Sequence, residues 1–266
     1  MTNILRYPLL VLSLSLVVLW LSVRIGVALR KRKRALDENE REDFGIIMAA
    51  ILTLLGLIIG FSFSMAITRY DQRKNLEEAE ANAIATEYVR VDFLSAADAA
   101  KVRALLRSYL DQRVLFYKTR DDRQLEQIDV ATAQLEADMW SAVQVPAAAQ
   151  PTPVFALAVT GMSDVLNSKG YTQAAWWNRI PSAAWGLMAV IAICCNLLIG
   201  YGARRGEART TLLLVLPFIV SISFCLIADI DSPRGGVVRV RAENLVSLSQ
   251  SLHSRESRPI LKSAGG

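Results

Sequence analysis

Residues 56–84 read GLIIGFSFSMAITRYDQRKNLEEAEANAI. They run from an uncharged apolar segment into a segment rich in charged residues, and they contain no proline. The apolar segment begins at Phe44 and carries no charge as far as Ile67. A helix of about 20 apolar residues is long enough to cross the hydrocarbon core of a bilayer. We therefore predict one continuous helix that leaves the membrane near Arg69 and continues outside it.

Small side chains recur every fourth residue in the apolar half of this stretch. They are Gly56, Gly60, Ser64 and Thr68. A four-residue spacing places them on one face of a helix, where another backbone can approach closely. We therefore predict that Gly56, Gly60 and Ser64 form a helix-packing face.

An adjacent face of the same helix carries Leu57 and Phe61, with Thr53 one turn earlier, and the charged half starts with Arg69 and Arg73. Two interpretations fit this pattern. In the first, a tightly packed transmembrane helix has a solvated exit. In the second, the helix lines a pore in an oligomer, and its charged residues ring the pore mouth.

The composition of the whole chain is typical of a membrane protein. Of its 266 residues, 53% are hydrophobic and only 8% are aromatic, and the mean hydropathy is positive. Four segments carry this excess, namely residues 7–29, 44–67, 181–203 and 210–228. We predict an all-α fold with four transmembrane helices. The first segment exceeds the usual ~7–15 apolar residues of a cleavable signal peptide, so we expect it to remain as an anchor.

The region between the second and third spans has apolar residues at helical spacing. Stripes over residues 76–94, 102–114 and 125–143 predict three amphipathic helices, followed by a proline-containing linker and a short helix over residues 154–166. We expect transmembrane helices 1 and 2 in residues 1–71, a helical extramembrane domain in 72–180, helices 3 and 4 in 181–232 and a polar tail in 233–266.

The net charge of +5 does not predict a nucleic-acid partner, because most basic residues are interspersed with acidic ones. The exception is the run from Arg30 to Arg34, directly after the first span. Such a run favours contact with anionic lipid and a cytoplasmic loop, which would place the helical domain outside. With this run included, the Lys and Arg residues near the span ends are equal in number on the two sides of the membrane, so their count alone does not set the orientation. The expected partner is the lipid bilayer.

Residues for catalysis or for metal or cofactor binding are scarce. The one histidine, His253, lies near the C-terminus, and the cysteines Cys194, Cys195 and Cys225 lie inside predicted spans. We therefore expect no metal, no cofactor and no enzymatic activity. Carboxylates are the remaining candidates for a hydrolase. The acidic residues of the helix after residue 72 have the spacing of a solvated face; they are Glu77, Glu78, Glu80 and Glu87.

Two carboxylates follow the fourth span, at Asp229 and Asp231, with Pro233 after them. Two interpretations remain open for this segment. It is either a polar helix end followed by a turn, or a functional site at the membrane surface.

Three segments resemble the bacterial bestrophin-like family, which is related to the bestrophin anion channels. They are GFSFSMAITRYDQR (60–73), EEAEANAIATEYVR (77–90) and DIDSPRGGVVRV (229–240). The Gly60–Phe61 pair and the Arg69–Tyr70 pair are similar to the corresponding part of the second helix in bestrophins. The resemblance extends over nearly the whole chain after residue 44.

This resemblance implies a homopentamer in the bacterial inner membrane that conducts inorganic anions. It implies a pore lined by the second helix of each copy, with a neck at Thr53, Leu57 and Phe61. Asp229, Asp231 and Pro233 match an acidic segment of bestrophins, but the longer acidic run that binds calcium is missing. The family also implies a cytoplasmic helical domain, opposite to the orientation that the basic run favours. The alternative function is a membrane-anchored scaffold or sensor without transport.

Overall fold

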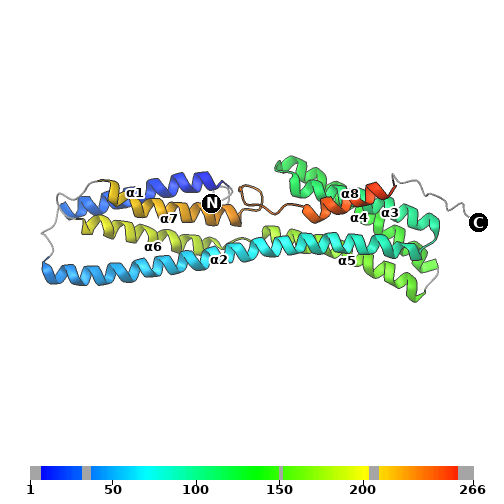
Figure 1. The fold of residues 1–266 in the computed structure, drawn as a ribbon, viewed down its shortest axis with the longest axis horizontal. Coiled ribbons are helices and arrows are strands. Elements are labelled where there is room, and N and C mark those ends of the chain that lie inside the picture. The colour runs from blue at the N-terminus through cyan, green and yellow to red at the C-terminus, as the bar shows by residue number, and fades with distance from the viewer. Residues whose placement is uncertain (1–6, 32–36, 150–151, 204–209, 257–266) are drawn as a thin grey trace, which may run out of the picture. The chain divides into compact units, whose positions relative to one another are not determined.

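The computed structural model describes residues 7–31, 37–149, 152–203 and 210–256 (Figure 1). The helices are α1 (Pro8–Lys31), α2 (Glu38–Arg90), α3 (Ala96–Lys118), α4 (Asp122–Ala149), α5 (Pro153–Trp177), α6 (Ser182–Gly202), α7 (Thr210–Asp231) and α8 (Glu243–Glu256). A 3-10 turn, Val91–Phe93, follows α2, and the described residues contain no strand. The all-α prediction is therefore confirmed. Most of the predicted basic run, residues 32–34, lies outside the described residues.

The chain divides into two compact units, each with its own core. The first, here called the membrane unit, comprises Met1–Tyr70 and Asn178–Arg239; the second, the helical unit, comprises Asp71–Trp177 and Val240–Gly266. In the described part of the chain, four helices are long and apolar enough to cross a membrane, which confirms the predicted number of spans. Helix α2 contributes its first half to the membrane unit and its second half to the helical unit.

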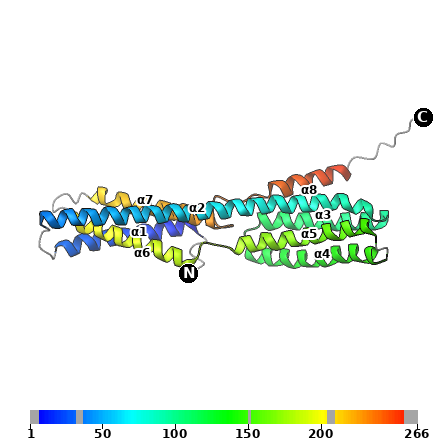
Figure 2. The same cartoon turned by 90° about the horizontal axis from the view of Figure 1, so that it is seen from below.

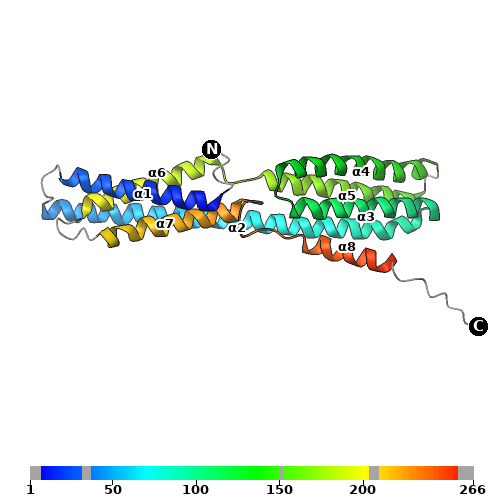
Figure 3. The same cartoon turned by 90° about the horizontal axis from the view of Figure 1, so that it is seen from above.

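In the membrane unit, α1 packs against both α6 and α7 (Figure 3). The core contains apolar side chains from all four membrane helices, including Leu19 of α1, Leu55 of α2, Met188 of α6 and Ile227 of α7. Because the hydrocarbon around a span is as apolar as these side chains, close packing must hold the helices together. The tightest packing is expected where side chains are smallest.

That tight contact lies between α1 and α6, at two glycines that the sequence analysis did not single out. A Cβ added at Gly26 would overlap with the carbonyl oxygen of Leu197, and one added at Gly200 would overlap with that of Val23. Nothing lies within 4 Å of a Cβ at Gly56 or Gly60 on α2. Within the protomer, the close backbone approach therefore occurs at Gly26 and Gly200 and not at the predicted face of α2.

In the helical unit, α4 packs against both α3 and α5 (Figure 2). Helix α3 starts after Ser95, whose side-chain oxygen accepts the backbone N–H of Asp98 at 3.2 Å and so caps the helix. Helix α4 continues through Pro146 to Ala149, so the predicted proline-containing linker begins later than its first proline. A proline removes one backbone hydrogen bond, and this loss is tolerated in the last turn of the helix, three residues before Ala149 and among alanines that favour helix.

Two other predicted boundaries are also wrong. Helix α5 does not end near residue 166 but extends to Trp177, because Thr172 and Trp176 beyond the predicted end are buried. Residues 243–256 of the predicted polar tail form α8, in which Leu245 and Leu252 are buried. The sequence of α8 is mostly polar. Leu245 and Leu252, which lie on one face of the helix, were too weak a pattern to predict that α8 packs against the helical unit.

The acidic residues of α2 are the largest departure from the sequence analysis. Glu78 is exposed, but Glu77, Glu80 and Glu87 are buried, so the predicted solvated face is wrong for these three. Buried residues of α2 follow alternating steps of four and three, at Arg73, Glu77, Glu80, Ile84 and Glu87. This spacing defines one inward helix face, although four of its five members are charged residue types.

Each of the first two buried carboxylates has specific partners. Glu77 accepts the backbone N–H of Leu245 at 3.0 Å and the side-chain amide of Asn244 at 2.7 Å, so it caps the N-terminus of α8. Glu80 pairs with Arg113 of α3. The Glu80 carboxylate also accepts hydrogen bonds from Tyr117 at 3.3 Å and Thr172 of α5 at 3.1 Å.

These contacts replace the water that the carboxylates lose on burial. Burial lowers the pKa of Arg113, but the Glu80 carboxylate outweighs this effect and raises it above its ordinary value. Arg113 therefore remains charged, and the pair links α2 to α3 inside the helical unit.

Glu87 differs from the other two because neither carboxylate oxygen has a hydrogen-bond partner among the described residues. Its side chain is 0% exposed and packs against Gly161 of α5, where an added Cβ would overlap with Oε2. Arg90 and Asp164 are the charged groups that act on this carboxyl. Burial raises the pKa of Glu87 to about 8, partly opposed by Arg90 and reinforced by Asp164. Glu87 is therefore mostly protonated at neutral pH.

We predict that Gly26→Leu and Gly200→Leu each lower the melting temperature of the full chain in detergent. The new side chain would meet a backbone carbonyl, and overpacking typically costs about 1–3 kcal/mol. Gly186→Leu on α6 is the matched control, because nothing lies within 4 Å of a Cβ there. Equal melting temperatures for all three variants would contradict the proposed close contact.

We also predict that Glu87 makes the stability of the protein fall as pH rises. In the unfolded chain Glu87 loses its proton near pH 4.5, whereas in the folded protein it keeps the proton until about pH 8. Between these values the folded state binds more protons, so the free energy of unfolding decreases with pH. Thermal unfolding of the full chain at several pH values should show wild type and Glu87→Gln together near pH 4.5 and Glu87→Gln more stable above pH 8. Parallel curves would contradict this assignment.

Candidate functional site

The membrane half of α2 has one packed face and one bare face. Leu55, Ser62 and Ala66 are buried in the membrane unit. On the other side, Leu57 is 53% exposed and Phe61 is 63% exposed. In the described part of the chain both apolar side chains are more than half exposed, and both lie in the uncharged span. We call the exposed side of α2 that carries them the open face.

All six residues predicted for the neck and the packing face are exposed. They are Thr53, Leu57, Phe61, Gly56, Gly60 and Ser64. Thr53 donates its hydroxyl to the carbonyl of Ala49 at 2.9 Å, so its polar atom is satisfied within the helix. This local hydrogen bond reduces the polarity that Thr53 would bring to an otherwise apolar neck. The open face is thus mainly apolar and lined with small residues along one edge.

The two arginines predicted for a pore mouth lie in different surroundings. Arg69 is half-buried, and its Nη1 atom is buried without a hydrogen-bond partner in the described part of the chain. Arg73 is only 1% exposed, and its Nε donates to the carbonyl of Ala175 in α5 at 3.3 Å. The burial of Arg73 does not fit its predicted place at a pore mouth, because this residue belongs to the inward face of α2 in the helical unit.

The two carboxylates in the last turn of α7 bind backbone groups. Asp229 accepts the N–H groups of Val237 at 2.7 Å and Val238 at 2.8 Å, which folds the following loop back onto the helix end. Asp231 accepts the N–H of Ile180 at 3.2 Å and so holds the segment that precedes α6. Gly236 lies so close that a Cβ would be 2.5 Å from the carbonyl oxygen of Asp229.

Pro233 is buried in the turn after these two carboxylates. Asp229 and Asp231 therefore hold the loop after α7 and the segment before α6 in place. Among the described residues, no group of three or more His, Cys, Asp or Glu side chains could hold a metal ion. This arrangement matches the simpler of the two interpretations, a polar helix end followed by a turn.

Several contacts that position α2 were not predicted from the sequence. The inward face from Arg73 to Glu87 could have been found from its alternating spacing of four and three residues, had charged residues been allowed as core positions. The partners of Glu80 lie 33 and 92 residues away in the chain, at Arg113 and Thr172, and no local pattern points to them. The glycines of the α1–α6 contact had a weak signal, since Ser22 precedes Gly26 by four residues.

Known proteins share this architecture. A bacterial bestrophin homologue from Klebsiella pneumoniae is 13% identical, and the match covers 94% of this chain and 99% of that chain with a TM-score of 0.64. A tyrosine-to-alanine mutant of that homologue gives a TM-score of 0.64 at 13% identity, covering 92% of this chain and 98% of the other. At this level of identity the likeness shows the fold.

Among curated proteins, none matches the chain. The family model of the Bestrophin-like domain matches residues 10–245, which include all eight helices at least in part. The chain therefore belongs to the bestrophin-like family.

Proposed function

We propose that this protein is a homo-oligomeric, bestrophin-like anion channel, a pentamer in the bacterial inner membrane, whose pore is lined by the open face of α2 from each copy. The observation that carries the proposal is the exposure of Leu57 and Phe61 on a membrane helix whose opposite side is packed. Membership of the bestrophin-like family supports a channel-like role in the membrane. Catalysis is not part of the proposal.

The small residues along the edge of the open face explain how copies would assemble. Gly56 and Gly60 have open space where a Cβ would lie, so the α2 helix of another copy can approach closely there. If these glycines lie at the contact between copies, Leu57 and Phe61 on the adjacent face point toward the axis of the assembly. Several copies would then form stacked rings of apolar side chains, with Thr53 one turn away.

The proposed mechanism is passive. Narrow apolar rings at Leu57 and Phe61 exclude water, so an anion crosses only when the neck is wide enough to stay hydrated. Arg69, at the end of the uncharged span, would raise the local anion concentration. Arg73 is left out of this role because it is buried against Ala175. Its contribution is to hold α2 against α5 within the helical unit.

We predict that the double variant Leu57→Ala and Phe61→Ala raises halide flux into liposomes by about tenfold, which corresponds to a barrier about 1.4 kcal/mol lower. The smaller side chains widen the apolar rings and ease passage of hydrated ions. The matched control is the double variant Leu187→Ala and Val190→Ala, two exposed apolar residues of α6. Unchanged flux from folded, assembled protein would remove the neck assignment.

We predict that the purified protein has the mass of a pentamer in mild detergent and that Gly60→Leu shifts it to smaller species. The leucine would fill the space that the adjoining copy needs, while the protomer fold stays intact because nothing lies within 4 Å of that Cβ. Gly186→Leu should keep the pentamer. A wild-type monomer or dimer would leave too few α2 helices to enclose a pore.

The alternative function is a membrane-anchored scaffold or sensor. It predicts a stable oligomer whose halide flux equals that of empty liposomes, for wild type and for the Leu57 and Phe61 double variant alike. It also predicts that Arg69→Ala has no effect on flux. The two flux measurements therefore separate the channel from the scaffold, given that the mass measurement has established assembly.

A further inference from the structure

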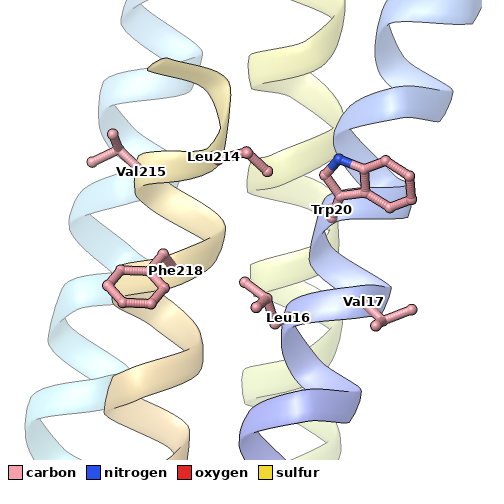
Figure 4. A pocket seen from close by; sticks show the side chains of 6 residues that line it. All are labelled: Leu16, Val17, Trp20, Leu214, Val215 and Phe218. Carbon is pink, nitrogen blue, oxygen red and sulfur yellow. The ribbon is translucent and has the colours of Figure 1, made fainter. Parts of the chain in front are cut away.

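A second apolar feature of the membrane unit lies between α1 and α7. A groove of about 450 Å³ is lined by Leu16, Val17, Trp20, Leu214, Val215 and Phe218. Figure 4 shows Leu16 and Leu214 projecting into the gap between the two helices, with Trp20 level with Leu214. All six side chains are apolar or aromatic, and among the described residues no charged side chain lines the groove.

The surroundings of the groove decide what can fill it. Both helices are membrane spans by length and composition, at Pro8–Arg30 and Leu213–Asp231. A groove that opens from these spans faces hydrocarbon, where a polar ligand would leave its hydrogen-bonding groups unsatisfied. An acyl chain has no such groups, and its methylenes fit an all-apolar lining. Hydrocarbon is therefore the chemistry that this groove accepts.

A positive charge lies next to the groove. The guanidinium of Arg24 lies over the ring of Trp20, 5.6 Å from its centre. A residue that lines the groove therefore makes a cation–π contact with Arg24. Arg24 comes one turn after Trp20 and six residues before the end of the α1 span, about 9 Å along the helix axis. That distance brings the side chain within reach of the phosphate layer.

Arg24 also has no ion-pair or hydrogen-bond partner among the described residues. A cation at this depth is stabilised by an anion, and the lipid phosphate is the anion nearest the end of a span. The basic run that begins at Arg30 lies at the same end of α1 and favours lipid of the same charge.

We propose that the α1–α7 groove is a binding site for one phospholipid with an anionic head group per protomer. Part of an acyl chain occupies the groove over Leu16 and Leu214, and the phosphate contacts Arg24. A bilayer lipid is favoured over a helix of a second copy because the groove extends over only about one turn of each helix, near 6 Å. Helix docking normally uses several turns. The proposal does not depend on the channel function.

The test counts bound lipid by native mass spectrometry of the full chain in mild detergent with added phosphatidylglycerol or phosphatidylcholine. We expect one retained phosphatidylglycerol per protomer, held about tenfold more tightly than phosphatidylcholine, a factor equal to about 1.4 kcal/mol. Val17→Trp enlarges a residue that lines the groove and should lower retention of both lipids. Arg24→Gln should keep retention but abolish the preference for phosphatidylglycerol.

The matched control is Val190→Trp, because Val190 is an exposed residue of α6 outside the groove. It should retain lipid as wild type does, and each variant's melting temperature shows that it is folded. Equal lipid counts for wild type and Val17→Trp would overturn the groove assignment. A smaller oligomer for Val17→Trp with unchanged lipid would show that a second copy covers the groove. A preference for phosphatidylglycerol that persists in Arg24→Gln would overturn the role of the arginine.

Discussion

The backbone of α2 continues without a break from Glu38 to Arg90, and most features of the two units follow from this continuity. One helix must present apolar side chains in a bilayer and must also fit into a bundle outside it. Its membrane half meets this demand with Leu55 and Ala66 packed inward and Leu57 and Phe61 left bare. Its other half uses an inward face that contains Arg73, Glu77, Glu80 and Glu87.

Because charged residues lie on this inward face, the stability of the helical unit depends on the groups that pair with them. A buried pair such as Glu80–Arg113 is costly to desolvate, but removing one member leaves an uncompensated charge, which is typically worse by about 3–5 kcal/mol. Glu87 avoids that cost by keeping its proton. The three carboxylates thus use different solutions to one problem, namely a cap on a helix end, an ion pair and protonation.

Small residues have two separate uses in the membrane unit. Gly26 and Gly200 bring α1 and α6 into backbone contact within one protomer. Gly56 and Gly60 have the spacing of a packing motif but lie on the open face, where the protomer provides no partner. The same residue type therefore permits a close helix contact within the protomer at one place and lies on an exposed helix face at another. Spacing alone did not distinguish these uses.

The sequence by itself determined the all-α class, the four spans and the continuity of α2, because hydropathy and helical period are local properties of the chain. It also placed Leu57, Phe61 and the small residues on neighbouring faces of one helix. Only the tertiary structure showed that Arg73 and three glutamates turn inward and that Gly26 and Gly200 meet Leu197 and Val23. It also showed that Asp229 and Asp231 hold backbone amides. These are contacts between residues far apart in the chain, and which distant groups meet depends on how the helices pack.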